Sequence, residues 1–367
     1  MIDGAPVNVR DYGAVGDGVT NDWQAFTDAW AAIVTNGGTL VIPAGTYLLN
    51  ADWVLAKLQK NYRITGYGAV ITSGASVVHA IDISGGGQQG QLVIEGLTIN
   101  HGANTTASTA IRNVGGTYAK IIRCSFSARN NVAYNAIKMT DAYWALVDKC
   151  QFYGTGSPKY GSAIWVNGEC NATKIQNNQV SEAVSCVYVD ANVSDGMVNG
   201  LRIVNNDFES ITNAITFNNP ASPAYTAAGV LVTLNRIESA TTFLNISGSL
   251  ADESSYPLTS YNNYFVAGNV TNYIQNPNNQ FVSIFEQTNF GSASVDNLVG
   301  GPNNFTVIAS DNGSNFQIQN RNGVSSWESS HLVMGTFHVW VDSSGRLRIK
   351  DGAPSSSTDG TVVGTQS

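Results

Sequence analysis

The chain has 367 residues and a formal net charge of −8, with an isoelectric point near 4.9. An acidic chain repels a phosphate backbone, so the composition argues against a nucleic-acid partner. Hydrophobic residues make up 43% of the sequence, which is enough for a core. No apolar run approaches the roughly 20 residues of a membrane-spanning helix, so membrane insertion is not expected.

The first patterned segment, residues 7–22, contains a short strand and a glycine-rich turn, and a helical pattern follows it. Four apolar residues share one face of that helix: Phe26, Ala29, Trp30 and Ile33. Asn21 is expected to cap the helix, with Gln24 returning the bond as in a capping box. A strand with a Pro-Gly turn comes next, at 37–47. The helix is predicted to cover the open end of the repeats that follow.

One sequence pattern recurs through most of the remaining chain: a short apolar strand, a turn that often contains asparagine, and a large apolar residue. Those large apolar residues are spaced by 25 to 29 positions and are Leu97, Phe126, Phe152, Val180, Phe208, Ile237, Phe265 and Phe290. Short alternating strands at this period, without a helical pattern between them, are typical of a solenoid.

The repeats align in columns. Two positions before the large apolar residue stand Cys124, Cys150, Asn178, Asn206, Asn235 and Asn263; five positions before it stand Leu92, Ile121, Val147, Ile175, Ile203 and Val232. A second strand follows in each coil. Each strand would pair with its copy one coil later, about 4.8 Å away. The asparagines would then form a ladder at a turn, where this residue tolerates left-handed backbone and can bond its neighbours. The sequence therefore predicts an all-β fold, a right-handed parallel β-helix.

The four cysteines do not suggest a disulfide framework. Cys124 and Cys150 share an inward column and are predicted to be stacked core thiols, whereas Cys170 and Cys186 fall in other parts of the coil. No CxxC spacing occurs, so a zinc site is not expected. No other metal and no cofactor is predicted for this chain. Free thiols are typical of a protein folded in a reducing compartment.

The repeat pattern ends after Phe290. Residues 337–342 and 346–350 are two strand patterns joined by a Ser-Ser-Gly turn, which predicts a hairpin. The predicted organisation is an N-terminal cap and first strands at 1–50, a parallel β-helix at 51–291, and a small C-terminal β module at 292–367.

The N-terminal segment 7–22, with Asp11, Tyr12 and Gly13 ahead of the capping helix, resembles the start of the pectate-lyase-like β-helix superfamily in its bacteriophage tailspike branch. The last segment, 351–367, is similar to the C-terminal ends of phage tailspikes. This resemblance implies a homotrimer on the virion tail, synthesised in the bacterial cytoplasm. It also implies that the protein binds, and usually cleaves, a bacterial surface polysaccharide such as capsule or lipopolysaccharide.

Glycoside hydrolysis uses two carboxylates, about 5–5.5 Å apart for retention or ~6.5–9.5 Å apart for inversion. One candidate set lies on the second strand of the coils, where alternation points one column outward. Aromatic faces suit sugar rings and a cation can hold a sugar carboxylate, so this column is predicted to bind substrate: Arg112, Lys138, Trp165 and Tyr188. The acids just beyond it are predicted catalysts: Glu169, Asp190 and Asp195. Glu169 and Asp190 are expected about 7–8 Å apart.

The second candidate set is Glu209 and Glu238, which directly follow inward residues and would stack one coil apart. Each set also has a structural alternative. The exposed aromatic residues can pack against a neighbouring chain, the acids can be solvated loop residues, and Arg236 can hold Glu209 and Glu238 in a surface charge cluster.

Three functions are compatible with these residues. The first is an endo-glycosidase, a polysaccharide depolymerase that works through paired carboxylates. The second is a polysaccharide lyase, in which a basic residue such as Lys138 or Arg112 removes a proton beside a uronic carboxylate. The third is a non-catalytic adhesin that grips glycan through Trp165 and Tyr188.

Overall fold

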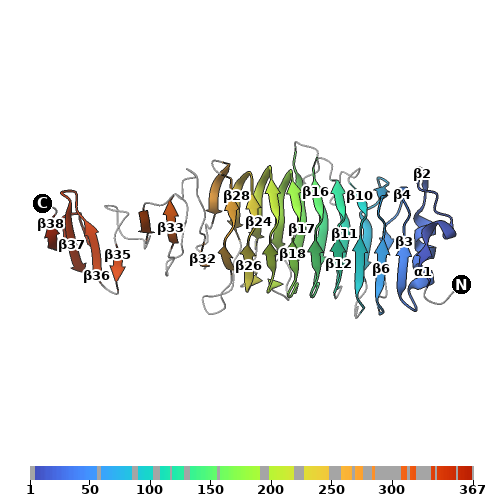
Figure 1. Ribbon diagram of the computed structural model, residues 1–367, viewed down its shortest axis with the longest axis horizontal. Coiled ribbons are helices and arrows are strands. Elements are labelled where there is room, and N and C mark those ends of the chain that lie inside the picture. The colour runs from blue at the N-terminus through green and yellow to red at the C-terminus, as the bar shows by residue number, and fades with distance from the viewer. Residues whose placement is uncertain are drawn as a thin grey trace.

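The strands between residues 7 and 285 stack into a long solenoid with the helix α1 (Trp23–Ile33) at its N-terminal end, as the ribbon diagram of this computed structural model shows (Figure 1). The structure describes residues 5–55, 59–84, 90–101, 108–115, 118–127, 133–154, 158–190, 198–218, 227–247, 258–266, 269–275, 283–285, 307–311, 315–319, 332–334, 337–352 and 354–365.

Three parallel sheets form the solenoid. Sheet 1 has, in order, β1 (Val7–Asn8), β3 (Gly38–Val41), β6 (Tyr62–Thr65), β9 (Leu92–Glu95), β12 (Lys120–Ile122), β15 (Leu146–Asp148), β18 (Lys174–Gln176), β22 (Arg202–Val204), β26 (Val230–Thr233), β29 (Leu258–Tyr261) and β32 (Ser283–Phe285). Sheet 2 has β2 (Asp17–Asn21), β4 (Gly45–Leu49), β7 (Ala69–Ser73), β10 (Thr98–Asn100), β13 (Ser125–Ser127), β16 (Gln151–Tyr153), β19 (Gln179–Ser181), β23 (Asp207–Glu209), β27 (Arg236–Ile237) and β30 (Tyr264–Phe265).

Sheet 3 contains β5 (Trp53–Val54), β8 (His79–Ser84), β11 (Ser108–Val114), β14 (Tyr134–Thr140), β17 (Tyr160–Asn167), β20 (Ala183–Asp190), β24 (Ile211–Asn218), β28 (Ala240–Ile246) and β31 (Val270–Gln275). A short parallel pair, β21 (Val198–Asn199) and β25 (Ala227–Ala228), connects sheet 3 to sheet 1 in successive coils, and a 3-10 helix, η1 (Val9–Tyr12), precedes β2. Every strand of the three sheets pairs with its copy in a neighbouring coil, so the predicted parallel β-helix is confirmed.

The register agrees with the predicted columns from Phe126 onward but not in the first copy. Phe126 pairs with Ile99, and Ile121 pairs with Ile94. The alignment through Leu97 and Leu92 was therefore wrong by two residues, because Leu97 occupies the turn position that Cys124 holds in the next coil. Leu97 is buried there, so its apolar character was a valid sign of the core but not of the register.

The predicted asparagine ladder is confirmed, and it is buried. The side-chain Nδ2 of Asn178 donates to Oδ1 of Asn206 at 2.9 Å, and the same bond joins Asn206 to Asn235 and Asn235 to Asn263. Each of these Oδ1 atoms also accepts from the backbone N–H of the preceding ladder residue at 3.0 Å. Cys124 and Cys150 stand in the same column, and all four cysteines of the chain are buried free thiols.

The left-handed backbone at this turn belongs to the residue before each ladder position, which corrects the reason given for the asparagines. That preceding residue has a φ between 52° and 58° at Arg123, Lys149, Asn177, Asn205, Leu234 and Asn262. The ladder residues are asparagines because both ends of the amide are bonded along the stack, whereas tolerance of positive φ matters one residue earlier.

Leu234 is a poor residue for this position, and we expect Leu234→Asn to raise the free energy of unfolding by about 0.5–1 kcal/mol. Its φ is 58° and its side chain is 54% exposed, while Asn177, Asn205 and Asn262 fill the same position in other coils. Urea unfolding followed by circular dichroism would measure the change. Leu234→Ala is the control, since it removes the exposed side chain and keeps the strain; an equal gain in that variant would contradict the explanation.

Helix α1 packs on the open end of the core, as predicted. The ring of Phe26 contacts Tyr47 and Trp53 edge-on, with centroids 5.3 and 5.0 Å apart. The capping box is wrong, however, because Gln24 Nε2 donates to Asp28 Oδ1 at 2.9 Å instead of reaching back. Asn21 Oδ1 accepts from the N–H of Trp23 at 3.3 Å, but the residue at the N-cap is Asp22, whose side chain makes no cap hydrogen bond, so the predicted cap at Asn21 is wrong as well.

The C-terminal part contains an antiparallel pair, β33 (Val307–Asp311) with β34 (Asn315–Gln319), and a four-stranded antiparallel sheet of β35 (Leu332–Met334), β36 (Phe337–Val341), β37 (Arg346–Asp351) and β38 (Thr361–Thr365). The predicted hairpin is thus confirmed as β36 and β37. Phe290 and the proposed boundary at 291 and 292 lie outside the described residues. No helix within the described ranges is long and apolar enough to cross a membrane.

Candidate functional site

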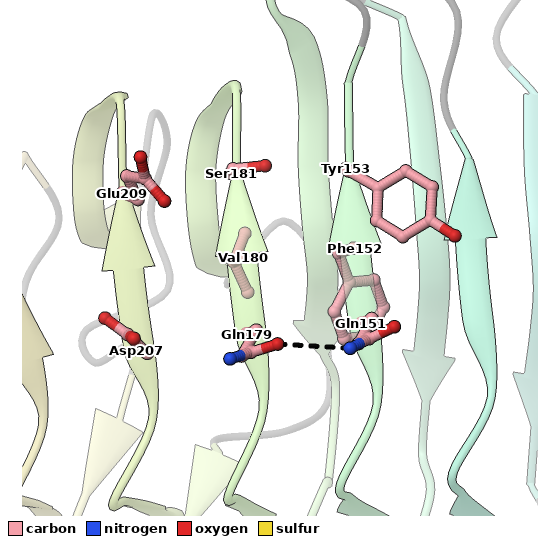
Figure 2. Close-up of a pocket in the computed structure, with 8 residues that line it drawn as sticks. All are labelled: Gln151, Phe152, Tyr153, Gln179, Val180, Ser181, Asp207 and Glu209. Carbon is pink, nitrogen blue, oxygen red and sulfur yellow. Dashed lines mark hydrogen bonds between the residues drawn. The ribbon is translucent and has the colours of Figure 1, made fainter.

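A depression of about 240 Å³ lies on the outer face of sheet 2, across three neighbouring coils. Figure 2 shows its outward side chains in two rows, Gln151, Gln179 and Asp207 in one and Tyr153, Ser181 and Glu209 in the other. The register requires this arrangement, because Gln151 pairs with Gln179 and Gln179 with Asp207. Phe152 and Val180 form its floor from the core side.

The two carboxylates of the depression have different surroundings. Arg236 in the next coil pairs with Asp207 Oδ1 at 2.8 Å and with Glu238 Oε2 at 2.6 Å. These hydrogen bonds, first to Asp207 and then to Glu238, raise the pKa of Arg236. Glu209 takes part in none of the ion pairs formed by the described residues. Arg236 therefore binds Asp207 and Glu238, so the predicted charge cluster forms around Glu238 and Asp207 and does not include Glu209.

Glu209 and Glu238 do lie one coil apart, as predicted. Ser181 pairs with Glu209, and the N–H of Glu238 donates to the carbonyl of Phe208 at 2.8 Å, as expected for the parallel ladder. Both side chains are exposed or partly exposed on the outer face of sheet 2. The depression contains Glu209 and Asp207, whereas Glu238 is not among its lining residues.

The four predicted substrate-binding residues form a continuous outward column on sheet 3, referred to here as the sheet 3 strip: Arg112, Lys138, Trp165 and Tyr188. Each pairs directly with the next along the stack. Lys138 Nζ lies 4.2 Å from the ring centroid of Trp165, and Trp165 and Tyr188 meet edge-to-face with centroids 5.3 Å apart. The predicted basic-to-aromatic strip is thus a column in which Lys138, Trp165 and Tyr188 contact one another through their side chains.

Burial and neighbouring charges shift several groups of the strip. Burial lowers the pKa of Lys138, and the positive charge of Arg112 lowers it further, while Asp190 acts in the opposite direction. Burial also raises the pKa of Tyr188 to about 12, with a further contribution from Asp190. Arg112 itself is bound by Asp82 at 3.0 Å, so much of its charge is already balanced.

The predicted acids near the strip lie in different environments. Asp190 is buried beside Asn218, whose Nδ2 lies 3.5 Å from Asp190 Oδ1, and it pairs with Asn167 in the preceding coil. Glu169 is exposed in the turn after β17 and accepts a hydrogen bond from the hydroxyl of Tyr143, one coil earlier. Asp195 lies outside the described residues. The Glu169 carboxylate is therefore bonded to the preceding coil, whereas Asp190 lies in the following coil.

Several residues of the two surfaces were missed by the sequence reasoning. Gln151, Gln179 and Tyr153 line the depression, and Asp82 extends the strip beyond Arg112. The signal was present, because these residues occupy the same outward columns as Asp207, Glu209 and Arg112 in earlier coils. It was overlooked because the search began from acids and aromatic residues and not from whole columns.

Solved structures with the same fold include proteins of different roles. The surface adhesin PfbA of Streptococcus pneumoniae superposes with a TM-score of 0.56 at 16% identity over 78% of this chain and 87% of the adhesin. A tailspike variant of Escherichia coli bacteriophage HK620, in complex with a pentasaccharide, gives 0.54 at 14% identity over 77% and 63% of the two chains. An exopolygalacturonase of Yersinia enterocolitica gives 0.53 at 15% identity over 78% and 69%. These likenesses concern the fold.

Sequence relatives match over shorter stretches. The pre-neck appendage protein of Bacillus phage phi29 is 28% identical over 184 residues, which is 46% of this chain and 20% of the phage protein. The plasmin- and fibronectin-binding protein A of S. pneumoniae is 30% identical over 179 residues, 42% of this chain and 25% of that protein. The matched segments thus span at most a quarter of these relatives.

A family model gives the wider match. Residues 153–365, more than half of the chain, match the family described as capsule depolymerase. This stretch contains most of the residues that line the sheet 2 depression, together with Trp165 and Tyr188 of the sheet 3 strip. The chain belongs to the capsule depolymerase family.

Proposed function

We propose that the protein is a phage tailspike that binds a bacterial surface polysaccharide, capsule or lipopolysaccharide, and cleaves it by glycoside hydrolysis within the chain. The observation that carries the proposal is the sheet 2 depression, where Asp207 and Glu209 face outward from one strand beside Gln151, Gln179 and Tyr153. Amides and an aromatic ring next to two acids are the groups that a sugar chain needs for recognition and hydrolysis.

Asp207 and Glu209 are proposed as the catalytic pair. Alternate residues of a strand lie about 6.6 Å apart, within the ~6.5–9.5 Å that inverting glycosidases use. Glu209 would donate its proton to the glycosidic oxygen as the bond to the anomeric carbon breaks. Asp207, whose charge is balanced by Arg236, would take a proton from the water that attacks the opposite face of the sugar. Glu209 with Glu238, one coil or about 4.8 Å apart, is the retaining alternative.

The sheet 3 strip is proposed to hold the polysaccharide, with Lys138 and Arg112 near an acidic sugar and Trp165 and Tyr188 against sugar rings. A lyase is the second candidate function. Its support is the lowered pKa of Lys138, because an amine that loses its proton more readily can act as the base of a β-elimination. The predicted catalytic acids for a site on sheet 3 are still Asp190, Glu169 and Asp195.

One experiment separates these functions. A panel of purified capsular polysaccharides and lipopolysaccharides is incubated with the protein, and polymer size and ultraviolet absorbance are followed together. The hydrolase predicts a fall in size without new absorbance. A fall in size with the absorbance of an unsaturated sugar would replace hydrolysis by the lyase reaction, and binding without any fall in size would leave an adhesin.

We further propose that the protein is a homotrimer and sits on the virion tail. Support comes from the phage appendage relative and from the tailspike with the same fold, together with the exposed Tyr264 on the outside of the solenoid. Light scattering of the intact chain should give about three times its 38.9 kDa. A monomer at the concentration used for cleavage assays would contradict this assembly.

A further inference from the structure

We propose that Trp144 and Ala172 form a further sugar-binding position, outside both the sheet 2 depression and the sheet 3 strip, where a pyranose ring of the polysaccharide stacks on the indole. The ligand class rests on the proposed function. The position lies in the turns that lead from sheet 3 to sheet 1, and it is referred to here as the aromatic ledge: Tyr118, Tyr143, Trp144, Glu169 and Ala172.

Tyr118 and Trp144 are stacked, exposed and in equivalent positions of successive coils. Their ring centroids are 5.1 Å apart with an interplanar angle of 8°, and the side chains are 41% and 51% exposed. The N–H of Tyr118 donates to the carbonyl of Tyr143 at 2.9 Å, and that of Trp144 donates to the carbonyl of Asn171 at 2.8 Å. The ladder thus fixes the backbone that carries both rings.

The turn itself does not require aromatic residues. Tyr118 and Trp144 have positive φ values of 57° and 52°, a conformation that favours glycine. In the next three coils the same position is held by Ala172, Gly200 and Gly229, also at positive φ. Since small residues satisfy the turn there, the two exposed rings serve something other than chain reversal.

The stack ends at Trp144, and this gives the ledge its shape. The next residue in the column, Ala172, offers a single methyl group, and Gly200 beyond it offers no side chain. The face of the indole turned toward these coils is therefore not covered by a third ring. One coil step of about 4.8 Å is close to the spacing at which Tyr118 and Trp144 stack, so a sugar ring over Ala172 would continue the same stack.

A hydrogen-bonded tyrosine and glutamate lie in the same turns as the indole and its neighbour in the column. The ring of Tyr143 is 6.0 Å from that of Trp144, and its hydroxyl donates to the exposed carboxylate of Glu169. Asp141 Oδ1 accepts the N–H of Glu169 at 2.9 Å and holds this turn. The bond to Glu169 raises the pKa of Tyr143 to about 12, so its hydroxyl keeps its proton at neutral pH. An apolar face beside a carboxylate matches a sugar ring, which has a C–H face and a hydroxyl edge.

The test compares binding to immobilised polysaccharides from the same panel for the wild type and three variants. Trp144→Asn removes the ring and keeps a residue that tolerates positive φ. Ala172→Tyr fills the ledge with a third stacked ring. Tyr67→Ala is the control, because Tyr67 is an exposed aromatic residue at a different turn, where its hydroxyl accepts from Arg123. Melting by circular dichroism verifies the fold of each variant.

We expect Trp144→Asn and Ala172→Tyr each to weaken binding about tenfold and Tyr67→Ala to leave it unchanged. Unchanged binding in both ledge variants would overturn the proposal. Variants that keep their affinity but fall to a lower molar mass in light scattering would also overturn it and would assign the rings to contacts between chains. If the wild type binds a polysaccharide without cleaving it, the hydrolase function is wrong. The ledge is then still tested by comparing the affinity of each variant with that of the wild type. No binding to any polymer by the wild type would overturn both.

Discussion

Glu209→Gln is expected to lower the initial rate of polysaccharide cleavage by about 10²–10⁴-fold, the contribution of a positioned acid or base. The change keeps the shape of the side chain and removes the proton that the leaving oxygen needs. Asp207→Asn should lower the rate to a similar degree, because the amide cannot take a proton from water. Viscometry or size-exclusion chromatography of a cleaved polysaccharide measures the rate.

Both changes should leave the fold intact, since Glu209 is exposed and Asp207 is partly exposed on the outer face of sheet 2. Ser181→Ala, within the same depression, is the matched control and should retain most of the activity. Glu238→Gln tests the retaining alternative, because a loss equal to that of Glu209→Gln would move the second role from Asp207 to Glu238. Full activity in Glu209→Gln, together with loss in Glu169→Gln or Asp190→Asn, would transfer the active site to sheet 3.

The coil and its columns could be predicted because every coil of a solenoid repeats the same pattern of buried and exposed positions. A residue that is buried in one coil is buried one period later, so the alignment of Phe126, Phe152 and Phe208 already contains the register of sheet 2. The first copy failed at Leu97, since an apolar residue in a ladder position has the same pattern as one in a strand. Periodicity identifies a column but cannot tell two adjacent inward columns apart when both are apolar.

The site was less predictable for a different physical reason. Outward positions follow from alternation, which is why the sheet 3 strip was predicted correctly as a column. Alternation along a strand does not, however, give the direction of a side chain in a turn. Glu169 comes two residues after the strand position that pairs with Asp190, yet its carboxylate is bonded to Tyr143 in the other direction along the stack. The stacking of Tyr118 on Trp144 depends on turn backbone in the same way.

Asn206→Ala is the second change for which we expect a large effect, a loss of about 3–5 kcal/mol in the free energy of unfolding. Asn206 Oδ1 accepts from both the backbone N–H and the side-chain Nδ2 of Asn178, and its own Nδ2 donates to Asn235 Oδ1 and to the carbonyl of Ile175. All of these lie in the core, where each polar group left without a partner costs about 1–3 kcal/mol. Alanine would leave several of them unpaired at once.

The adjacent residue supplies the control for this prediction. Asn205 is exposed and has a φ of 55°, so Asn205→Gly should change stability by no more than about 0.5 kcal/mol. Asn206→Asp gives a further test with a defined sign. Burial would raise the pKa of the new carboxyl above that of the unfolded chain, so this variant should lose stability as pH rises from 4 to 7. If Asn206→Ala and Asn205→Gly had equal urea midpoints, the ladder would contribute little to stability. If the free energy of unfolding of Asn206→Asp did not depend on pH, that side chain would be in water and not in the core.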